Sequence, residues 1–210
     1  IVSFVNPFSY IELLKSPALI DGVDSFFADG ALLRLFHNLF YSSKKVERLS
    51  FDFSSIAHDV FDWCQHRNKK VALVGAEPSE IIQAVNNIKI LYPTLNIVYS
   101  HDGYVKDEDI CEKVNENIID SGAEVLICGM GTPLQESFLL KFKNSESNLQ
   151  LGFSCGGFLT QTSIKPDYYH PLVKKTGLRW LQRMIMHSHV RNRVFAEYPK
   201  FLLLYLRKHL

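Results

Sequence analysis

Residues 129–136 contain the residue types in this sequence that most readily suggest ligand binding: two glycines, Thr132, Pro133 and the pair Gln135–Glu136. Thr132 is of a type that caps helices and Pro133 suits a first helical turn, so a helix is predicted from about residue 133. Gln135 and Glu136 would then lie near its N-terminus. An acid there commonly pairs with the helix dipole, and Gln135 beside it adds a neutral donor and acceptor suited to sugar hydroxyls.

Asp29 is a second candidate, because it stands between an apolar stretch that contains Phe26 and Phe27 and a glycine, Gly30. An Asp immediately before Gly is typical of a turn. An Asp held against apolar neighbours could instead act as a general base that takes a proton from a reacting hydroxyl. The residues alone leave both interpretations open.

Two other polar groups are weaker candidates. Asp107 and Asp109 imitate an Asp-x-Asp metal motif, but they open a predicted helix, where the dipole alone favours acids. His187 and His189 are two residues apart and do not share a helix face, so a zinc site is not expected. We predict no metal ligands and no cofactor.

The elements that must position these residues alternate between short apolar runs and amphipathic segments. Strands are predicted over residues 1–5, 70–75, 95–99, 123–129 and 149–154, and helices over 9–14, 31–40, 55–66, 79–91, 107–121 and 133–142. Short buried strands that alternate with helices are typical of a mostly parallel sheet with helices on both faces. The predicted fold class is therefore α/β, Rossmann-like.

Ligands of such sheets bind beyond the carboxyl ends of the strands. Glycines gather at three predicted strand ends, namely Gly75, Gly129 with Gly131, and Gly156 with Gly157. Glycine lets the backbone approach a ligand, and the next helix points its N–H groups at the same space, which favours phosphate. The alternative is that these glycines only make tight strand-to-helix turns.

The net charge of +1 hides an uneven distribution. Residues 170–210 hold nine Lys and Arg and one acid, a net charge of +8, whereas residues 1–169 have a net charge of −7. Two helices are predicted in this region, over 176–186 and 190–210, and Pro199 is expected to kink or restart the second. We predict a body over residues 1–170 and a basic, amphipathic helical appendage over 171–210. Such a tail suggests an anionic partner: a phosphate-bearing ligand, a membrane surface or nucleic acid.

The appendage also has an apolar stripe, formed by Trp180, Leu181, Met184 and Ile185, which suits a membrane interface or packing against the body or another subunit. The longest late apolar run, 201–206, has six residues, whereas a membrane span needs roughly 20. The four cysteines are widely spaced and are interpreted as reduced thiols. We therefore expect a cytoplasmic protein without a membrane span.

Taken in chain order, these pieces resemble the WecG/TagA/CpsF family of glycosyltransferases. The resemblance rests on Asn6, Asp29-Gly30, Arg48 with Asp52, Gly75-Ala76, Gly103-Tyr104, the block from Gly129 to Glu136, Cys155-Gly156-Gly157 and Trp180-Leu-Gln-Arg183. It extends over nearly the whole chain, and the ordered set is much more specific than any one of its parts.

The resemblance implies an inverting transferase that needs no metal ion. Members move a sugar, frequently N-acetylmannosamine or its uronic acid, from a nucleotide diphosphate onto a sugar linked to undecaprenyl diphosphate. It implies that Asp29 is the general base, that Gln135 lies in the site and that Arg48 lines the pocket. It also implies that arginines of the appendage close over the diphosphate, here Arg183, Arg191 and Arg193. The remaining substrate-binding residues expected from it are Asn6, Gly30, Asp52, Gly75, Gly103, Tyr104, Gly129, Gly131, Pro133, Glu136, Gly156 and Gly157.

The partners implied in this way are a UDP-sugar donor and a polyprenyl-diphosphate-linked sugar acceptor. The appendage would contact an anionic membrane surface, at the inner face of the plasma membrane, and nucleic acid is not expected. Family members often self-associate, which leaves a homo-oligomer open.

Departures from the family pattern lie near the expected sugar contacts. Phe4 stands where Thr is frequent, Ser50 stands where Gly is common, and residues 168–171 replace an Arg-Ala-Pro element. These differences leave the donor and acceptor sugars open more than the reaction type.

Two rival functions remain at this point. A nucleotide-binding Rossmann oxidoreductase would be expected to have a Gly-x-Gly-x-x-Gly pattern, which residues 75–78 lack. The basic tail also suggests a non-enzymatic module that binds an anionic surface or nucleic acid, but the acidic body argues against it.

Overall fold

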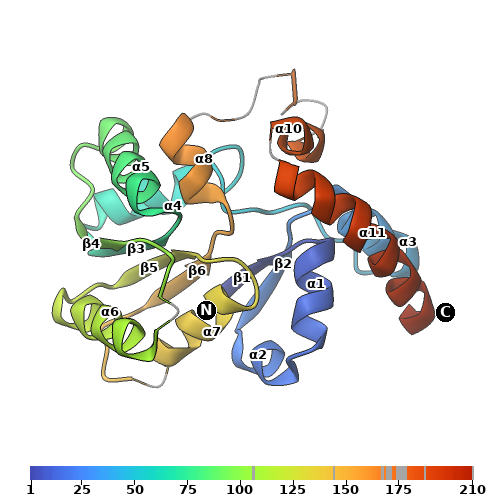
Figure 1. Cartoon of the computed structure of the whole chain (residues 1–210), viewed down its shortest axis with the longest axis horizontal. Helices are drawn as coiled ribbons and strands as arrows, with labels where there is room; N and C mark the ends of the chain where they lie inside the picture. The colour runs from blue at the N-terminus through green and yellow to red at the C-terminus, as the bar shows by residue number, and fades with distance from the viewer. Residues whose placement is uncertain are drawn as a thin grey trace.

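The computed structural model describes residues 1–105, 107–143, 145–166, 168, 172–173, 179–186 and 188–209, without the side chains of Arg183 and His189. The strands are β1 (Val2–Val5), β2 (Ser25–Ala28), β3 (Val71–Gly75), β4 (Ile97–His101), β5 (Val125–Gly129) and β6 (Leu151–Ser154). They form one sheet in the order β2-β1-β6-β5-β3-β4, and every neighbouring pair is parallel (Figure 1). This confirms the predicted α/β, Rossmann-like class.

Helices precede, connect and follow these strands. They are α1 (Pro7–Leu14), α2 (Pro17–Gly22), α3 (Ala31–Phe40), α4 (Ala57–His66), α5 (Pro78–Leu91), α6 (Glu108–Asp120), α7 (Leu134–Lys143), α8 (Phe158–Ile164), α10 (Arg179–Met186) and α11 (Ser188–His209). Figure 1 shows α10 and α11 beside the end of the sheet that carries β1 and β2.

Alternation along the central strands builds a hydrophobic core on each face of the sheet. Leu73 and Ile127 point to the face covered by α4, α5 and α8, where they join one buried cluster. Their neighbours in sequence, Val74 and Leu126, point to the opposite face and join a second cluster with α6 and α7. Successive strand residues face opposite sides, so continuous apolar runs are required where both faces are covered.

A third cluster fixes α11 against the rest of the molecule. Phe201 and Tyr205 of α11 pack with Val5 at the end of β1, Leu13 of α1 and Leu33 of α3. Phe201 is fully buried, and its ring meets the ring of Tyr10 edge to face. The second half of α11 therefore shares a core with the first 40 residues. The division into a body and an appendage at residue 170 stays a prediction.

Several elements differ from the sequence-based expectation. The sequence does not predict β2, because this edge strand exposes Phe26 and Phe27 by more than a third and is not a buried apolar run. It also misses α2 and the short α8. The fourth strand lies two residues later than predicted, and α11 continues through Pro199 without a break. Residues 176–178 of the predicted tail helix lie outside the described part of the chain.

Replacement of Phe201 tests the anchoring of α11. Phe201→Ala is expected to lower the free energy of unfolding by about 3–5 kcal/mol, because it removes a large ring from a packed interior. Urea unfolding followed by circular dichroism measures this. Leu203→Ala, at a position of the same helix that is 72% exposed, is the matched control and should change stability by less than about 0.5 kcal/mol. Equal effects of the two substitutions would contradict the packing of Phe201 in this core.

Candidate functional site

The pairing of β1 with β2 brings two of the predicted site residues together. These strands are parallel and in register, with Val5 opposite Ala28, so that Asn6 and Asp29 follow at the same edge of the sheet. The Asp29 N–H donates to the Val5 carbonyl at 2.8 Å. Asn6 is also the N-cap of α1, where its side-chain oxygen accepts from the N–H groups of Phe8 and Ser9.

Arg48 holds Asp29 in place. The loop that follows α3 returns along β2, where the Leu49 N–H donates to the Ala28 carbonyl at 3.0 Å. Arg48 Nη2 then donates to Asp29 Oδ1 at 2.8 Å and to Asp52 Oδ2 at 3.2 Å. An opposite charge this close favours the ionised carboxylate. Asp29 is therefore ion-paired and oriented, and its role as a general base stays a prediction.

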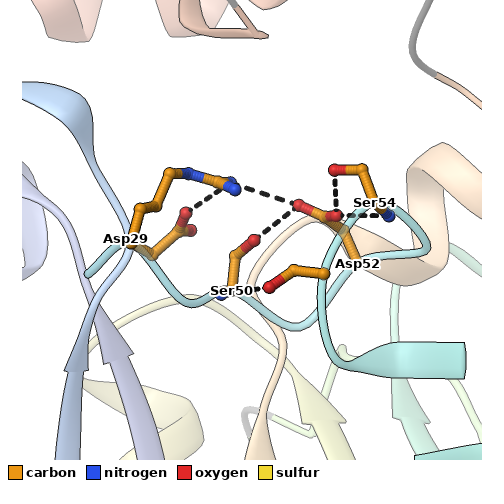
Figure 2. Close-up of polar contacts among 6 residues, drawn as sticks. Asp29, Ser50, Asp52 and Ser54 are labelled. Carbon is orange, nitrogen blue, oxygen red and sulfur yellow. Dashed lines mark hydrogen bonds and ion pairs between the residues drawn. The ribbon is translucent and has the colours of Figure 1, made fainter. Parts of the chain in front are cut away.

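Asp52 is the buried end of this bridge. Its carboxylate accepts from Ser50 Oγ and from the backbone N–H and hydroxyl of Ser54 (Figure 2). Burial opposes the charged form, but the hydrogen bonds of Ser50 and Ser54 together with Arg48 outweigh it and lower the pKa of Asp52. Asp52 thus stays ionised, and it positions Arg48, which in turn positions Asp29.

Glycine at the next strand ends serves two physical purposes. A Cβ on Gly129 would lie 2.7 Å from the Gly156 carbonyl oxygen, so the close approach here is between neighbouring strand ends. Gly131 and Gly156 instead have φ of +79° and +52°, and no atom lies within 4 Å of the place that a Cβ would take. A side chain at Gly129 is thus excluded by the neighbouring strand end, whereas Gly131 and Gly156 face open space.

Gln135 and Glu136 tie two of these strand-end loops together. Gln135 Oε1 accepts from the Gly156 N–H at 3.1 Å, and its Nε2 donates to Glu136 Oε1 at 2.9 Å. Glu136 Oε1 also accepts from the hydroxyls of Ser3 and Thr132. Glu136 is wholly buried and Gln135 is 3% exposed. The expected direct contact of Glu136 with a sugar does not fit this burial, and the Gln135 amide is already engaged in bonds within the protein.

Three cavities lie along the carboxyl edge of the sheet. The central cavity, about 290 Å³, lies over the ends of β1, β2, β5 and β6. The large cavity, about 670 Å³, lies over β3 and β5 and shares Gly129, Met130, Gly157, Thr160 and Gln161 with the central one. The apolar cavity, about 430 Å³, lies between α3 and the helices α10 and α11. It shares Asn6 and Asp29 with the central cavity, so the three adjoin in a row.

Most of the predicted site residues line these cavities. The central cavity is lined by Asn6, Asp29, Asp52, Gly129, Gly131, Gln135, Gly156, Gly157 and Arg193. Gly103 and Tyr104 line the large cavity, while Gly30 and Arg48 line the apolar one. Gly75 ends β3 directly before Ala76 of the large cavity, and Pro133 directly precedes α7.

The predicted arginines of the appendage are separated. Arg193 reaches the central cavity, with its guanidinium carbon 4.5 Å from the centre of the Phe8 ring. Such stacking fixes a long cationic side chain without neutralising it. Arg191 is exposed on the same helix, and the side chain of Arg183 lies outside the described residues.

Two acids of the large cavity are missed by the sequence reasoning. Glu77 and Glu80 lie at the start of α5, where the Glu80 carboxylate accepts from the Glu77 N–H, and Thr160 donates to Glu80. Tyr104 donates to Glu77 at 3.4 Å, and this carboxylate raises the pKa of Tyr104. The sequence Gly75-Ala-Glu-Pro-Ser-Glu80 follows a predicted buried strand and opens a predicted helix, so it could have indicated that both acids lie at the carboxyl edge of the sheet. These acids make the start of α5 unfavourable for phosphate, contrary to the general expectation for helices after strand ends.

Among the described residues, no group of three or more His, Cys, Asp and Glu side chains is arranged to hold a metal ion. The search for a membrane-spanning helix, made over the same part of the chain, finds none of sufficient length and apolarity.

A parallel sheet with polar groups, a cationic side chain and adjoining cavities at its carboxyl edge is typical of α/β proteins that bind nucleotides. The particular family follows from comparison: residues 1–210 match the model of the glycosyl transferase WecG/TagA/CpsF family, and the chain belongs to that family. It is therefore a glycosyltransferase, which decides against the oxidoreductase and the non-enzymatic binding module.

Two relatives with assigned activities differ in the sugar that they transfer. The chain is 40% identical over 210 residues, all of its length and 87% of the relative, to a UDP-Gal:alpha-D-GlcNAc-diphosphoundecaprenol beta-1,4-galactosyltransferase of Shigella boydii. It is 24% identical, over 94% of its length and 75% of the relative, to an N-acetylglucosaminyldiphosphoundecaprenol N-acetyl-beta-D-mannosaminyltransferase of Bacillus spizizenii.

The bond between Gln135 and Glu136 can be tested by exchanging donor and acceptor. Gln135→Glu places two buried carboxylates in contact and should lower the free energy of unfolding by at least about 3 kcal/mol. The double variant Gln135→Glu/Glu136→Gln again pairs an amide with a carboxylate and should recover at least half of the loss. Urea unfolding of the wild type, Gln135→Glu, Glu136→Gln and the double variant gives the coupling energy between the two positions. A double variant as unstable as the sum of both single variants would contradict a direct interaction.

The lowered pKa of Asp52 predicts a pH-dependent contribution to stability. As the pH falls through the ordinary carboxyl range, the unfolded chain takes up a proton before folded Asp52 does, so stability is lost. Asp52→Asn should cost about 2 kcal/mol at pH 7, and less as the pH falls below about 4. Urea unfolding at several pH values measures this. Glu112→Gln, at an exposed position of α6, is the control. A pH-independent cost would argue against an ionised Asp52.

Proposed function

We propose that this chain transfers a hexose, with inversion, from a UDP-sugar onto a sugar linked to undecaprenyl diphosphate, in the synthesis of a cell-surface polysaccharide. The observation that carries the proposal is the position of Asp29, a carboxylate paired with Arg48 on the wall shared by the central and apolar cavities. A base placed there meets a donor sugar from one side and an acceptor from the other. The names of the relatives supply the substrate classes.

The donor would extend from the large cavity into the central one. Glu77 and Tyr104 of the large cavity suit the hydroxyl and N–H groups of a nucleoside and disfavour its phosphates. The diphosphate would lie against Arg193 and the loop of Gly156 and Gly157, since the first turn of α8 has no acid. The transferred sugar would then occupy the central cavity next to Asp29.

The reaction needs one base and a stabilised leaving group. Asp29 takes the proton from the acceptor hydroxyl as its oxygen attacks the anomeric carbon, and the bond from that carbon to the phosphate oxygen breaks on the opposite side. Attack opposite the leaving group inverts the anomeric centre. UDP departs with the bonding electron pair, and the fixed guanidinium of Arg193 stabilises the charge that develops there. Gln135 contributes by holding the Gly156 loop in place. We propose that these groups suffice without a metal ion.

The names of the two relatives suggest which donor sugars to test first. Because the more similar of the two relatives is named as a galactosyltransferase, UDP-galactose is the first donor to test, followed by UDP-N-acetylmannosamine and its uronic acid. Phe4 departs from the family pattern, lines the central cavity and stacks on Phe27, so it is placed to affect which donor sugar fits.

The location of the chain follows from its substrates. We propose a cytoplasmic protein that associates peripherally with the inner face of the plasma membrane through residues 171–210. Leu181 and Ile185 are exposed on α10, and each basic residue near an anionic surface contributes about 1 kcal/mol. Self-association through the same helices is compatible with this arrangement.

Replacement of Asp29 tests the proposed function. Asp29→Asn should lower kcat for sugar transfer by about 10²–10⁴-fold, because proton removal is lost, with little change in donor affinity. The assay measures UDP release and lipid-linked product in the presence of a chelator. Asp21→Asn, on the exposed side of α2, is the control. Near wild-type turnover of Asp29→Asn would refute the base assignment, and activity that appears only with added magnesium or manganese would refute the metal-independent step.

A further inference from the structure

The proposed donor placement does not occupy the apolar cavity. It lies between α3, which contributes Leu32 and Leu35, and the tail helices, which contribute Trp180, Val194 and Tyr198. Its volume of about 430 Å³ falls in the range of about 300–1,000 Å³ that is typical of ligand sites. A nucleotide or a free sugar would leave most of its hydrogen-bonding groups unpaired against such walls.

The two ends of this cavity differ in chemistry. Asn6 and Asp29 form the end that it shares with the central cavity, and the guanidinium-bearing residues Arg48 and Arg179 also line it. Leu35 is 60% exposed and Trp180 is 42% exposed, so apolar side chains mark the side that is open to the surroundings. Because Arg48 is already paired with Asp29 and Asp52, a ligand that fits both ends has hydroxyl groups near Asp29 and hydrocarbon beyond it.

We propose that the apolar cavity binds the first isoprenoid units of the lipid acceptor, with the acceptor diphosphate beside Arg179. The proposal rests on the proposed function and adds the location of the acceptor. The acceptor sugar then lies between its own diphosphate and Asp29, with its hydroxyl directed into the central cavity. The remainder of the lipid leaves the cavity past Leu35 and Trp180, and the protein contacts only the isoprenoid units closest to the diphosphate.

This placement has a measurable consequence for acceptor length. Apolar burial contributes in proportion to the area removed from water, so each isoprenoid unit inside the cavity should increase kcat/KM and each unit beyond it should not. General adsorption of the protein to a lipid surface would instead continue to improve with tail length and would not depend on the cavity walls.

The test compares two soluble acceptors that share the same N-acetylglucosamine diphosphate, one esterified with a farnesyl chain and one with a methyl group. Val194→Trp fills the cavity, whereas Phe195→Trp changes the neighbouring residue of α11, which is 69% exposed and is not among the cavity-lining residues. We expect the ratio of kcat/KM for the farnesyl acceptor to that for the methyl acceptor to fall at least tenfold in Val194→Trp. In Phe195→Trp the ratio should stay within twofold of wild type.

The outcomes separate the two proposals. If the wild-type protein prefers the farnesyl acceptor but Val194→Trp and Phe195→Trp lower the preference equally, the farnesyl chain binds to the protein surface and not in the cavity. If the wild-type protein uses both acceptors equally well, the cavity assignment is wrong although the proposed function stands. If it transfers to neither acceptor from any of the named donors, the proposed function fails and the cavity assignment fails with it. Leu35→Gln, at an exposed cavity residue, repeats the test should Val194→Trp not fold.

Discussion

The double ion pair of Arg48 is the interaction on which the arrangement of the site depends. One guanidinium joins Asp29, at the end of an edge strand, to Asp52, in a loop whose own serines hold it. Because β2 is four residues long and half exposed, it could not by itself hold a carboxylate in one orientation. The buried partner stabilises the cation, and the cation fixes the carboxylate that faces the cavities. In the proposed mechanism, loss of Asp52 would therefore disturb the position of Asp29.

The sequence was sufficient to predict the parallel sheet, and the cavities lie at the carboxyl edge where a ligand was expected. Short apolar runs such as those ending at Gly75 and Gly129 are required where a strand is buried on both faces, so periodicity and length identify them. The positions of Asn6, Asp29, Arg48 and Asp52 near one another came from the family resemblance, and the register of β1 against β2 supplies the physical reason. β2 itself was missed because an edge strand need not be buried.

What the sequence could not reveal is the difference between Gln135 and Glu136. Two adjacent polar residues at the start of a helix give the same sequence signal for exposure. Glu136 nevertheless points into the interior and accepts from Ser3, 133 residues earlier in the chain. Such a long-range bond has no local signal. Phe201 and Tyr205 likewise have partners far away in the sequence, in α1, α3 and the end of β1. Tertiary contacts, rather than local propensity, decide both cases.

The path of α11, rather than the net charge of residues 170–210, accordingly decides which tail residues line the cavities. Val190 lines the large cavity, Arg193 the central cavity, and Val194 and Tyr198 the apolar cavity, so the first half of α11 forms a wall of all three. The second half is held in the core by Phe201. Under the proposed function, a helix anchored at one end would contact both the donor and the acceptor at the other. Its basic residues are not one interchangeable patch: Arg193 meets the central cavity, while Arg207 and Lys208 lie in the last turn of the helix, beyond its buried anchor.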